Sequence, residues 1–139
     1  MATLQESYIQ TKTQREALKQ VLTWFDQFQE TCVPHHIWLQ CQLALIEGFT
    51  NALRHAHQGL PAETPIEIEV VLSPQAVDIR IWDQGPGFDL ETVLERKMAT
   101  TTSESEGGRG LKIMHTVADV LTYQRTTDGR NCLHIQKRY

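Results

Sequence analysis

The sequence predicts an α+β fold, a two-layer α/β sandwich in which helices cover one face of a mixed, mostly antiparallel sheet. Three observations support this prediction. Long segments carry apolar residues at helical spacing, short segments alternate between apolar and polar residues, and the short segments come mainly in pairs joined by turns. Strands joined as hairpins, with helices grouped apart from them, are typical of α+β proteins and not of doubly wound parallel sheets.

The N-terminal third predicts one strand and two helices. Thr3 to Gln10 alternates weakly and predicts an edge strand. Apolar residues recur at helical spacing from Gln14 to Glu30, and Thr13 is a suitable N-cap, so a helix of about four turns is expected. Cys32-Val33-Pro34 ends that helix because proline lacks an amide donor. A second helix is expected from about Pro34 to His57, with a core stripe formed by Trp38, Cys41, Leu45, Phe49, Ala52 and Ala56.

Two hairpins are expected in the remainder of the chain. Ile66 to Leu72 and Val77 to Trp82 alternate between apolar and polar residues, with a turn between them. Leu121 to Arg125 and Cys132 to Lys137 form the second pair, around a turn that contains Asp128-Gly129. This spacing predicts four strands in addition to the weak one at the N-terminus.

The stretch between the two hairpins predicts helical and irregular structure. Phe88 to Met98 has weak helical periodicity. Ala99 to Glu106 is small, polar and acidic, with nothing to bury, so we expect it to be mobile. Gly107 to Gly110 then forms a glycine turn, and a third helix is expected from Leu111 to Val120.

Composition excludes several classes of protein. A chain of 139 residues predicts one domain, residues 1–139. Thirteen basic and 17 acidic residues give a net charge of −4, which argues against general affinity for nucleic acid or for an anionic membrane. No apolar run is long enough to span a bilayer and no signal peptide is visible, so a cytoplasmic protein is expected. The chain has three cysteines, an odd number, at Cys32, Cys41 and Cys132. Their spacing matches neither a metal site nor a disulfide framework, so free thiols are expected.

The polar face of the second predicted helix carries Glu47 and Asn51, four residues apart. Residues at this spacing share one face of a helix, so a carboxylate and an amide point into the same space. A carboxylate can accept a proton from a hydroxyl, and an amide oxygen is a hard ligand suited to magnesium. On the spacing alone an ordinary solvated face is the more common explanation, because polar pairs four residues apart occur often on helices.

Two glycine-rich segments lie downstream. Asp83-x-Gly85-x-Gly87 ends a predicted strand, where an aspartate could accept a hydrogen bond from an exocyclic amine and glycines let a ligand approach the backbone. The alternative is a simple glycine turn that closes the strand. Gly107-Gly108-Arg109-Gly110-Leu111 opens a predicted helix, whose free amides and dipole suit phosphate. Arg109 either adds a positive charge there or faces solvent.

In this order and at these intervals, the three segments resemble the boxes of the Bergerat-fold ATPases, which include gyrase B-type topoisomerases, heat-shock chaperones, histidine kinases and mismatch-repair ATPases. The first box, E-x-x-x-N, matches Glu47 and Asn51, and the second, D-x-G-x-G, matches Asp83, Gly85 and Gly87. The third, G-x-G at a helix start, matches Gly108 to Gly110.

Within that superfamily the chain is most similar to the bacterial anti-sigma factor serine/threonine kinases. E-x-x-x-N-A-x-x-H matches Glu47, Asn51, Ala52 and His55, and E-G-G-x-G-L matches Glu106 to Leu111. The resemblance covers the chain from about Trp38 to the C-terminus and implies a single ATP-binding kinase and anti-sigma domain. It also implies a homodimer that binds a sigma factor and a small anti-sigma antagonist of the STAS type.

The resemblance implies roles for the matched residues. ATP and Mg²⁺ would bind between the helices and the sheet, with Asp83 reading adenine and Asn51 holding Mg²⁺. Glu47 would act as the base on a serine or threonine hydroxyl of the antagonist. The remaining nucleotide contacts would come from His55, Gly85, Gly87, Gly107, Gly108, Arg109, Gly110 and Leu111, with Phe88 to Glu106 as the ATP lid.

Three positions depart from the family pattern. Gly129-Arg130-Asn131 stands where family members often have Gly-Thr, whose threonine helps to hold phosphate; Arg109 replaces an apolar residue; and Glu106 stands where some members have arginine. Two alternatives therefore stay open. One is a nucleotide-dependent regulator that binds a partner without transferring phosphate, and the other is the catalytic domain of a split histidine kinase.

Overall fold

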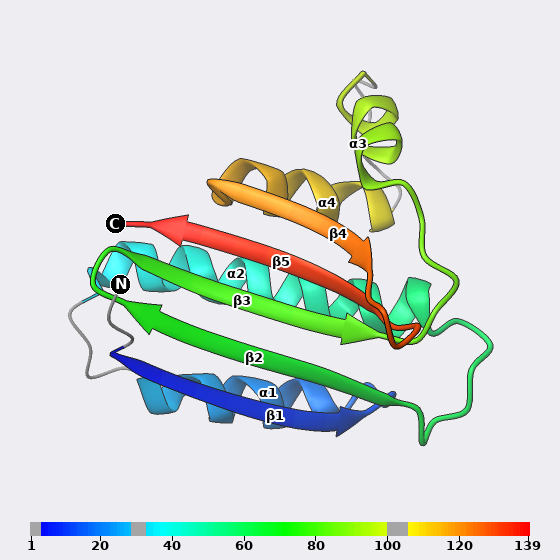
Figure 1. Cartoon of the computed structure of the whole chain (residues 1–139), viewed down its shortest axis with the longest axis horizontal. Helices are drawn as coiled ribbons and strands as arrows, with labels where there is room; N and C mark the ends of the chain where they lie inside the picture. The colour runs from blue at the N-terminus through cyan, green and yellow to red at the C-terminus, as the bar shows by residue number, and fades with distance from the viewer. Residues whose placement is uncertain (1–3, 29–32, 100–105) are drawn as a thin grey trace.

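The computed structural model describes residues 4–28, 33–99 and 106–139. Its centre is a five-stranded sheet in the order β1-β2-β3-β5-β4 (Figure 1), and all four pairings between the described strands are antiparallel. The two-layer α+β prediction is confirmed, with an antiparallel sheet where a mixed, mostly antiparallel one was expected. The strands are β1 (Gln5–Lys12), β2 (Pro65–Ser73), β3 (Ala76–Asp83), β4 (Val120–Arg125) and β5 (Asn131–Arg138).

The helices that contact the sheet lie on one of its faces (Figure 1). α1 packs on β1, α2 on the central strands β3 and β5, and α4 on α2 and β4, while α3 packs against α4. The bounds are α1 (Ala17–Phe25), a 3₁₀ turn η1 (Asp26–Phe28), α2 (His35–Asn51), a π-helical turn η2 (Ala52–Ala56), α3 (Leu90–Ala99) and α4 (Glu106–Val117).

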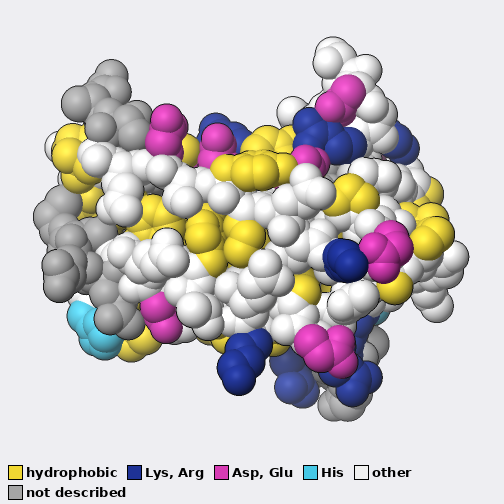
Figure 2. Space-filling view, turned by 90° about the horizontal axis from the view of Figure 1, so that it is seen from below, with side chains coloured by type: hydrophobic (Ala, Val, Ile, Leu, Met, Phe, Trp, Pro, Cys, Tyr) yellow, Lys and Arg dark blue, Asp and Glu magenta, His cyan; other side chains and the backbone are white. Residues whose placement is uncertain are grey.

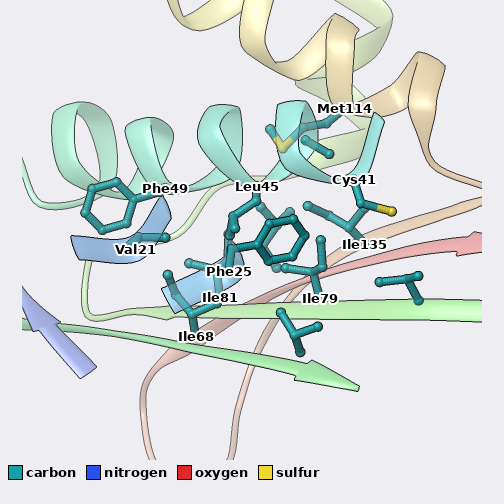
Figure 3. Packing of buried hydrophobic residues seen from close by; sticks show 14 of the residues in the cluster. Val21, Phe25, Cys41, Leu45, Phe49, Ile68, Ile79, Ile81, Met114 and Ile135 are labelled. Carbon is teal, nitrogen blue, oxygen red and sulfur yellow. The ribbon is translucent and has the colours of Figure 1, made fainter. Parts of the chain in front are cut away.

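Strict alternation in the strands builds the floor of the core. Every second residue of β2 points at the helices, and Ile66, Ile68 and Val70 are fully buried. The predicted stripe of α2 packs into the same core, with Leu45 and Phe49 fully buried (Figure 3). Gly48 lets this helix approach closely, since a Cβ there would lie only 2.6 Å from Ile81 Cδ1.

Several boundaries differ from the predictions. The first helix begins at Ala17, not Gln14, and Thr13 is not its N-cap; Glu16 occupies that position without a side-chain cap. The Thr13 hydroxyl instead forms hydrogen bonds with His57 and with the Thr64 carbonyl, so it is not available to cap the helix. The long second helix changes to a π-helical turn after Asn51. Residues 29–32, with Cys32, and 100–105 of the segment expected to be mobile lie outside the described residues.

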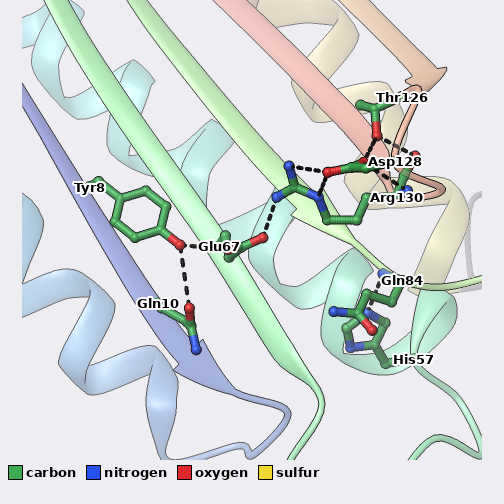
Figure 4. A network of polar contacts seen from close by, with 8 residues as sticks. All are labelled: Tyr8, Gln10, His57, Glu67, Gln84, Thr126, Asp128 and Arg130. Atoms are coloured by element: carbon green, nitrogen blue, oxygen red, sulfur yellow. Dashed lines mark hydrogen bonds and ion pairs between the residues drawn. The ribbon is translucent and has the colours of Figure 1, made fainter.

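The face of the sheet opposite the helices carries a polar network (Figure 4). Tyr8 donates a hydrogen bond to Glu67 at 2.6 Å, and Glu67 forms an ion pair with Arg130. The Arg130 guanidinium also pairs with Asp128 at 2.8 Å and lies 5.4 Å from the centre of the Trp82 ring. These contacts pair the charged groups of the network and connect β1, β2 and the turn between β4 and β5. Basic and acidic side chains are likewise interspersed on the side of the molecule that Figure 2 shows.

Two further sequence predictions concern cysteines and membranes. In the described part of the chain, Cys41 and Cys132 are free thiols. Burial raises the pKa of Cys41 to about 12, so this thiol stays protonated and behaves as a small core residue. None of the helices between residues 4 and 139 that the structure describes has the length and apolar character needed to cross a bilayer.

A buried histidine ties together the loops at one end of the sheet. His57 is 2% exposed. Its Nε2 accepts a hydrogen bond from the Gln84 amide at 2.8 Å (Figure 4), and Nδ1 lies 2.7 Å from the Thr13 hydroxyl. That hydroxyl donates to the Thr64 carbonyl, so it accepts from Nδ1–H. His57 is therefore neutral, and it fixes the loop that begins directly after Asp83.

We predict that His57 makes the stability of the fold depend on pH. Burial lowers the pKa of His57 below its ordinary value, and the Asp83 carboxylate opposes this only in part. The unfolded chain takes up a proton at about pH 6.5, before the folded chain does. The stabilisation that neutral His57 gives to the folded protein is thus complete above about pH 6.5. It is lost as the pH falls through the lower pKa that His57 has in the folded protein.

The measurement is the free energy of unfolding in urea between pH 8 and pH 5, for the wild type and His57→Gln. The variant should be less stable by about 1–3 kcal/mol at neutral pH, because its amide cannot hold both partners. It should also lose part of the pH dependence. The matched control is His36→Gln, at an exposed histidine. An equal pH dependence in all three proteins would contradict the prediction.

Candidate functional site

The topology of the sheet brings three predicted segments to one end of the molecule. β5 is inserted between β3 and β4, so the last residue of β3, Asp83, pairs directly with Asn131 at the start of β5. The C-terminal part of α2 packs over this region and contacts α4 along its side. The end of β3, the end of α2 and the start of α4 therefore surround one site.

Glu47 lies against Gly110, near the start of α4. A Cβ at Gly110 would be only 2.9 Å from Glu47 Oε1, so the glycine provides the room for this carboxylate. Asn51 is one helical turn further along α2, where the helix changes to the π-helical turn. Both side chains are half-buried, not fully solvated. The structure thus places the Glu47 carboxylate beside Gly110 of the glycine-rich segment, and Asn51 on the same helix one turn away.

Asp83 is a buried carboxylate with three hydrogen-bond donors. It is 2% exposed. Oδ1 accepts from the Gly85 amide and from Asn131 Nδ2, each at 2.9 Å, and Oδ2 accepts from the Tyr123 hydroxyl at 2.8 Å. Donors in a buried site compensate the cost of removing a carboxylate from water. Asp83 is therefore a fixed acceptor at the bottom of the site.

Asn131 belongs to the neighbourhood of Asp83. Besides Asp83, its side-chain amide donates to the Gly85 carbonyl at 2.9 Å, and the residue is 2% exposed. The family resemblance connects this position with phosphate, because members often carry there a threonine that helps to hold it. In the structure Asn131 is committed instead to the aspartate and to the loop that follows it.

The D-x-G-x-G spacing has a steric explanation. A Cβ at Gly85 would lie 2.3 Å from the Ala56 carbonyl oxygen, so any side chain there would collide with the backbone of η2. Gly87 has φ +80°, a conformation that L-residues rarely adopt, and its Cβ would meet Asn131 Oδ1 at 2.9 Å. The two glycines therefore let the loop after Asp83 pack against η2 and Asn131.

The third predicted segment is helical from the outset. α4 begins at Glu106, so Gly107, Gly108 and Gly110 lie in its first turns and not in a turn that precedes a helix starting at Leu111. Glycine inside a helix costs about 0.8–1.0 kcal/mol relative to alanine, so this end of α4 has low intrinsic helical stability. The amides at a helix start lack partners within the helix and suit an anion.

The other predicted site residues differ in accessibility. His55 is exposed on η2, and Arg109 is exposed on α4. The Leu111 side chain is 4% exposed and belongs to the core, so only its backbone could contact a ligand. The structure therefore brings Glu47 against Gly110 and Gly85 against η2, and it leaves the His55 and Arg109 side chains exposed.

Sequence reasoning missed two residues of the site. Tyr123 reaches Asp83 from β4, and its ring stacks on Phe88 with centroids 4.5 Å apart and planes 27° apart. Arg125 donates to the Pro86 and Gly129 carbonyls, at 2.8 and 2.7 Å, and so joins the Asp83 loop to the turn before β5. The sequence contained no signal for these contacts, because they depend on the order of the strands.

The donor set fits a purine nucleotide. A buried, acceptor-only carboxylate suits the exocyclic amine of adenine, and a glycine-rich helix start suits phosphate. Among the described residues, no group of three or more His, Cys, Asp or Glu side chains could hold a metal ion by itself. A magnesium ion that takes most of its ligands from phosphate and water would need only one protein oxygen, such as that of Asn51.

Comparison with known proteins gives consistent relatives. The chain is 29% identical over 89 residues to the serine-protein kinase RsbW of Bacillus pumilus, which covers 60% of this chain and 55% of that protein. It is 29% identical over 83 residues to the serine-protein kinase RsbW of Listeria monocytogenes. That match covers 56% of this chain and 52% of the Listeria protein. The chain thus spans about half the length of the curated relatives it matches.

A solved structure shares the fold. The SiaB–SiaC complex from Pseudomonas aeruginosa contains a chain that superposes with a TM-score of 0.58 at 10% identity, over 99% of this chain and 91% of that one. At this identity the similarity concerns the fold alone.

The sequence itself matches the histidine kinase-like ATPase domain over residues 11–137, from the end of β1 to the end of β5. The chain therefore belongs to the histidine kinase-like ATPase domain family.

Proposed function

We propose that this chain is an ATP-dependent serine/threonine protein kinase and anti-sigma factor that acts by partner switching. Residues 1–139 would form one ATP-binding unit in the cytoplasm. Its substrate would be an anti-sigma antagonist of the STAS type, and a homodimer of the chain would bind the sigma factor. The relatives named as serine-protein kinases support this proposal, as does the membership of the ATPase family.

The observation that carries the proposal is the position of Glu47 against the glycine-rich start of α4. A terminal phosphate held by the amides at that helix start would lie beside a carboxylate that can accept a proton. Arg109, exposed in the same turn, could add a positive charge. Asp83 is more deeply buried, and in the proposal it would bind the base, apart from the phosphate.

ATP supplies the phosphoryl group, and Mg²⁺ would offset the charge of its phosphate oxygens. In the proposed reaction Glu47 accepts the proton of a serine or threonine hydroxyl of the antagonist. The hydroxyl oxygen forms a bond to the γ-phosphorus while the bond from that phosphorus to the β–γ bridging oxygen breaks, which leaves ADP. Asn51 would hold Mg²⁺ through its amide oxygen, and the amides of Gly107 and Gly108 would stabilise the transferred group, while Gly110 leaves room for the Glu47 carboxylate.

The remaining predicted contacts are peripheral. His55 would approach the nucleotide from η2, where it is exposed. Gly85 and Gly87 would let the base approach the backbone of the Asp83 loop, and Leu111 would contribute only backbone. Phe88 to Glu106 would act as the lid, a segment that includes α3.

We predict that Asp83→Asn weakens ATP binding by about ten- to hundredfold, because an amide cannot accept hydrogen bonds from all its donors and from a base amine. Isothermal titration with ATP and Mg²⁺ measures this directly. Asp78→Asn is the matched control, since Asp78 lies on the same strand but points away from the helices and contacts His134. Equal affinity in Asp83→Asn and the wild type would refute the proposed base subsite.

We predict that Glu47→Gln binds ATP within about threefold of the wild type but transfers phosphate at least about a hundredfold more slowly, as expected for loss of a general base. The assay uses γ-labelled ATP and the antagonist that co-purifies with the protein from its source cells. Glu69→Gln, on the face of the sheet away from the helices, is the control.

The same assay separates the alternative functions. A Glu47→Gln rate equal to that of the wild type would remove Glu47 from the mechanism. ATP-dependent capture of the antagonist without any transfer by the wild type would indicate a binding regulator. Acid-labile phosphate on a partner would indicate a histidine kinase.

A further inference from the structure

Tyr123 makes an unusual contact with the carboxylate that is proposed to read the base. β4 is the edge strand and β5 separates it from β3, yet the Tyr123 hydroxyl reaches Asp83 Oδ2 at 2.8 Å. Tyr123 and Leu133 are paired residues in the β4–β5 register, two positions from the pair of Arg125 and Asn131. The phenol ring therefore extends toward the helix-facing side of the sheet, beside Asn131 and the end of β3.

The three donors on Asp83 differ in how easily they can be replaced. The Gly85 amide is two residues away in the same tight loop, and Asn131 is paired with Asp83 in the sheet. Both hold Oδ1. The Gly85 donor cannot move without rearranging the backbone, and the buried Asn131 side chain is held in addition by its hydrogen bond to the Gly85 carbonyl. Tyr123 holds Oδ2 through a side chain that needs only a rotation to leave. Because Asp83 is 2% exposed, a ligand can reach Oδ2 only if something moves.

The phenol offers Asp83 what an adenine would offer. It is a flat aromatic ring with one hydrogen-bond donor directed at the carboxylate, and it is stacked on a second ring, Phe88, at 4.5 Å. Burial, reinforced by the hydrogen bond to Asp83, raises the pKa of Tyr123, so the hydroxyl remains a donor at neutral pH. Phe88 follows directly after the D-x-G-x-G loop and precedes α3, so the stack connects this contact to the start of the proposed lid.

We propose that Tyr123 competes with adenine for Asp83 Oδ2, and that nucleotide binds when the Tyr123–Phe88 pair is displaced. This inference rests on the proposed function in that Asp83 is taken as the acceptor for the base. Tyr123 is then a gating residue that sets the affinity of the site. Displacement of Phe88 would also move the segment that leads into α3.

Competition has a specific thermodynamic signature. In the wild type every nucleotide must break the bond between Tyr123 and Asp83 before it enters, whatever its base. A Tyr123→Phe variant has no such bond to break, so the affinity rises by the same factor for ATP and for inosine triphosphate, which lacks the exocyclic amine. The ratio of the two affinities therefore stays unchanged. If Tyr123 instead oriented Asp83 for recognition, the variant would bind ATP less well and discriminate less.

The test is isothermal titration of wild type, Tyr123→Phe and Tyr8→Phe with ATP and with inosine triphosphate. Tyr8→Phe removes an equivalent bond between tyrosine and carboxylate, at 2.6 Å to Glu67, on the opposite face of the sheet. We expect the dissociation constants of both nucleotides to fall by about three- to tenfold in Tyr123→Phe, with their ratio preserved, and no change in Tyr8→Phe. An unchanged or higher dissociation constant for ATP in Tyr123→Phe would overturn the proposal that Tyr123 competes with the base. A changed ratio between the dissociation constants of ATP and inosine triphosphate would overturn it as well.

A second measurement uses the wild type alone and does not depend on how well the variant folds. The protein is labelled with ¹³C at tyrosine Cζ, and the Tyr123 signal is assigned by elimination with Tyr8→Phe and Tyr139→Phe. Addition of ATP and Mg²⁺ should move this signal toward that of a solvated tyrosine. A signal that stays unchanged while ATP is bound overturns the inference and leaves the proposed function intact. Failure of the wild type to bind ATP overturns both.

Discussion

The site depends on one buried charge, the carboxylate of Asp83. A carboxylate is stable away from water only if donors surround it, and the structure supplies three from three places: the loop after β3, the start of β5 and the middle of β4. Those donors can converge only because β5 lies between β3 and β4. The order of the strands and the position of the proposed base subsite are thus two aspects of the same requirement.

The close packing around Asp83 explains why glycine occurs where it does. Gly85 leaves room for the Ala56 carbonyl, Gly110 leaves room for the Glu47 carboxylate, and Gly48 leaves room for the side chains of the sheet. In each case a helix or turn approaches a neighbour to a distance that excludes a Cβ. The glycines that resemble nucleotide-binding boxes therefore also set the distances between α2, α4 and the end of β3, before any ligand is considered.

The sequence predicted those features that follow from local periodicity. The alternation of β2 and the stripe of α2 each identify their buried faces, because burial repeats every second residue in a strand and at helical spacing in a helix. The Glu47–Asn51 pair and the Asp83 loop are predicted as site residues by spacing and resemblance together, and the structure places Glu47 against Gly110 and Asp83 in a buried pocket of donors. Thr13 was misjudged because its hydroxyl has a tertiary partner that no local pattern reveals. Asn131 and Tyr123 meet Asp83 only through strand order, so single-sequence reasoning had no means of placing them beside it.

The position of β5 between β3 and β4 has a consequence for folding during synthesis. On a ribosome, residues 65–83 can form the β2–β3 hairpin early, but β4 has β5 as its partner in the described sheet and must wait for it. Until residues 131–138 emerge, Asp83 lacks Asn131 and the hairpin exposes the edge that β5 will cover. An unpaired edge of this kind favours association with other chains. The nascent protein is therefore prone to aggregation after β3 has formed and before β5 is available. β5 both covers the exposed edge of β3 and supplies Asn131 to Asp83.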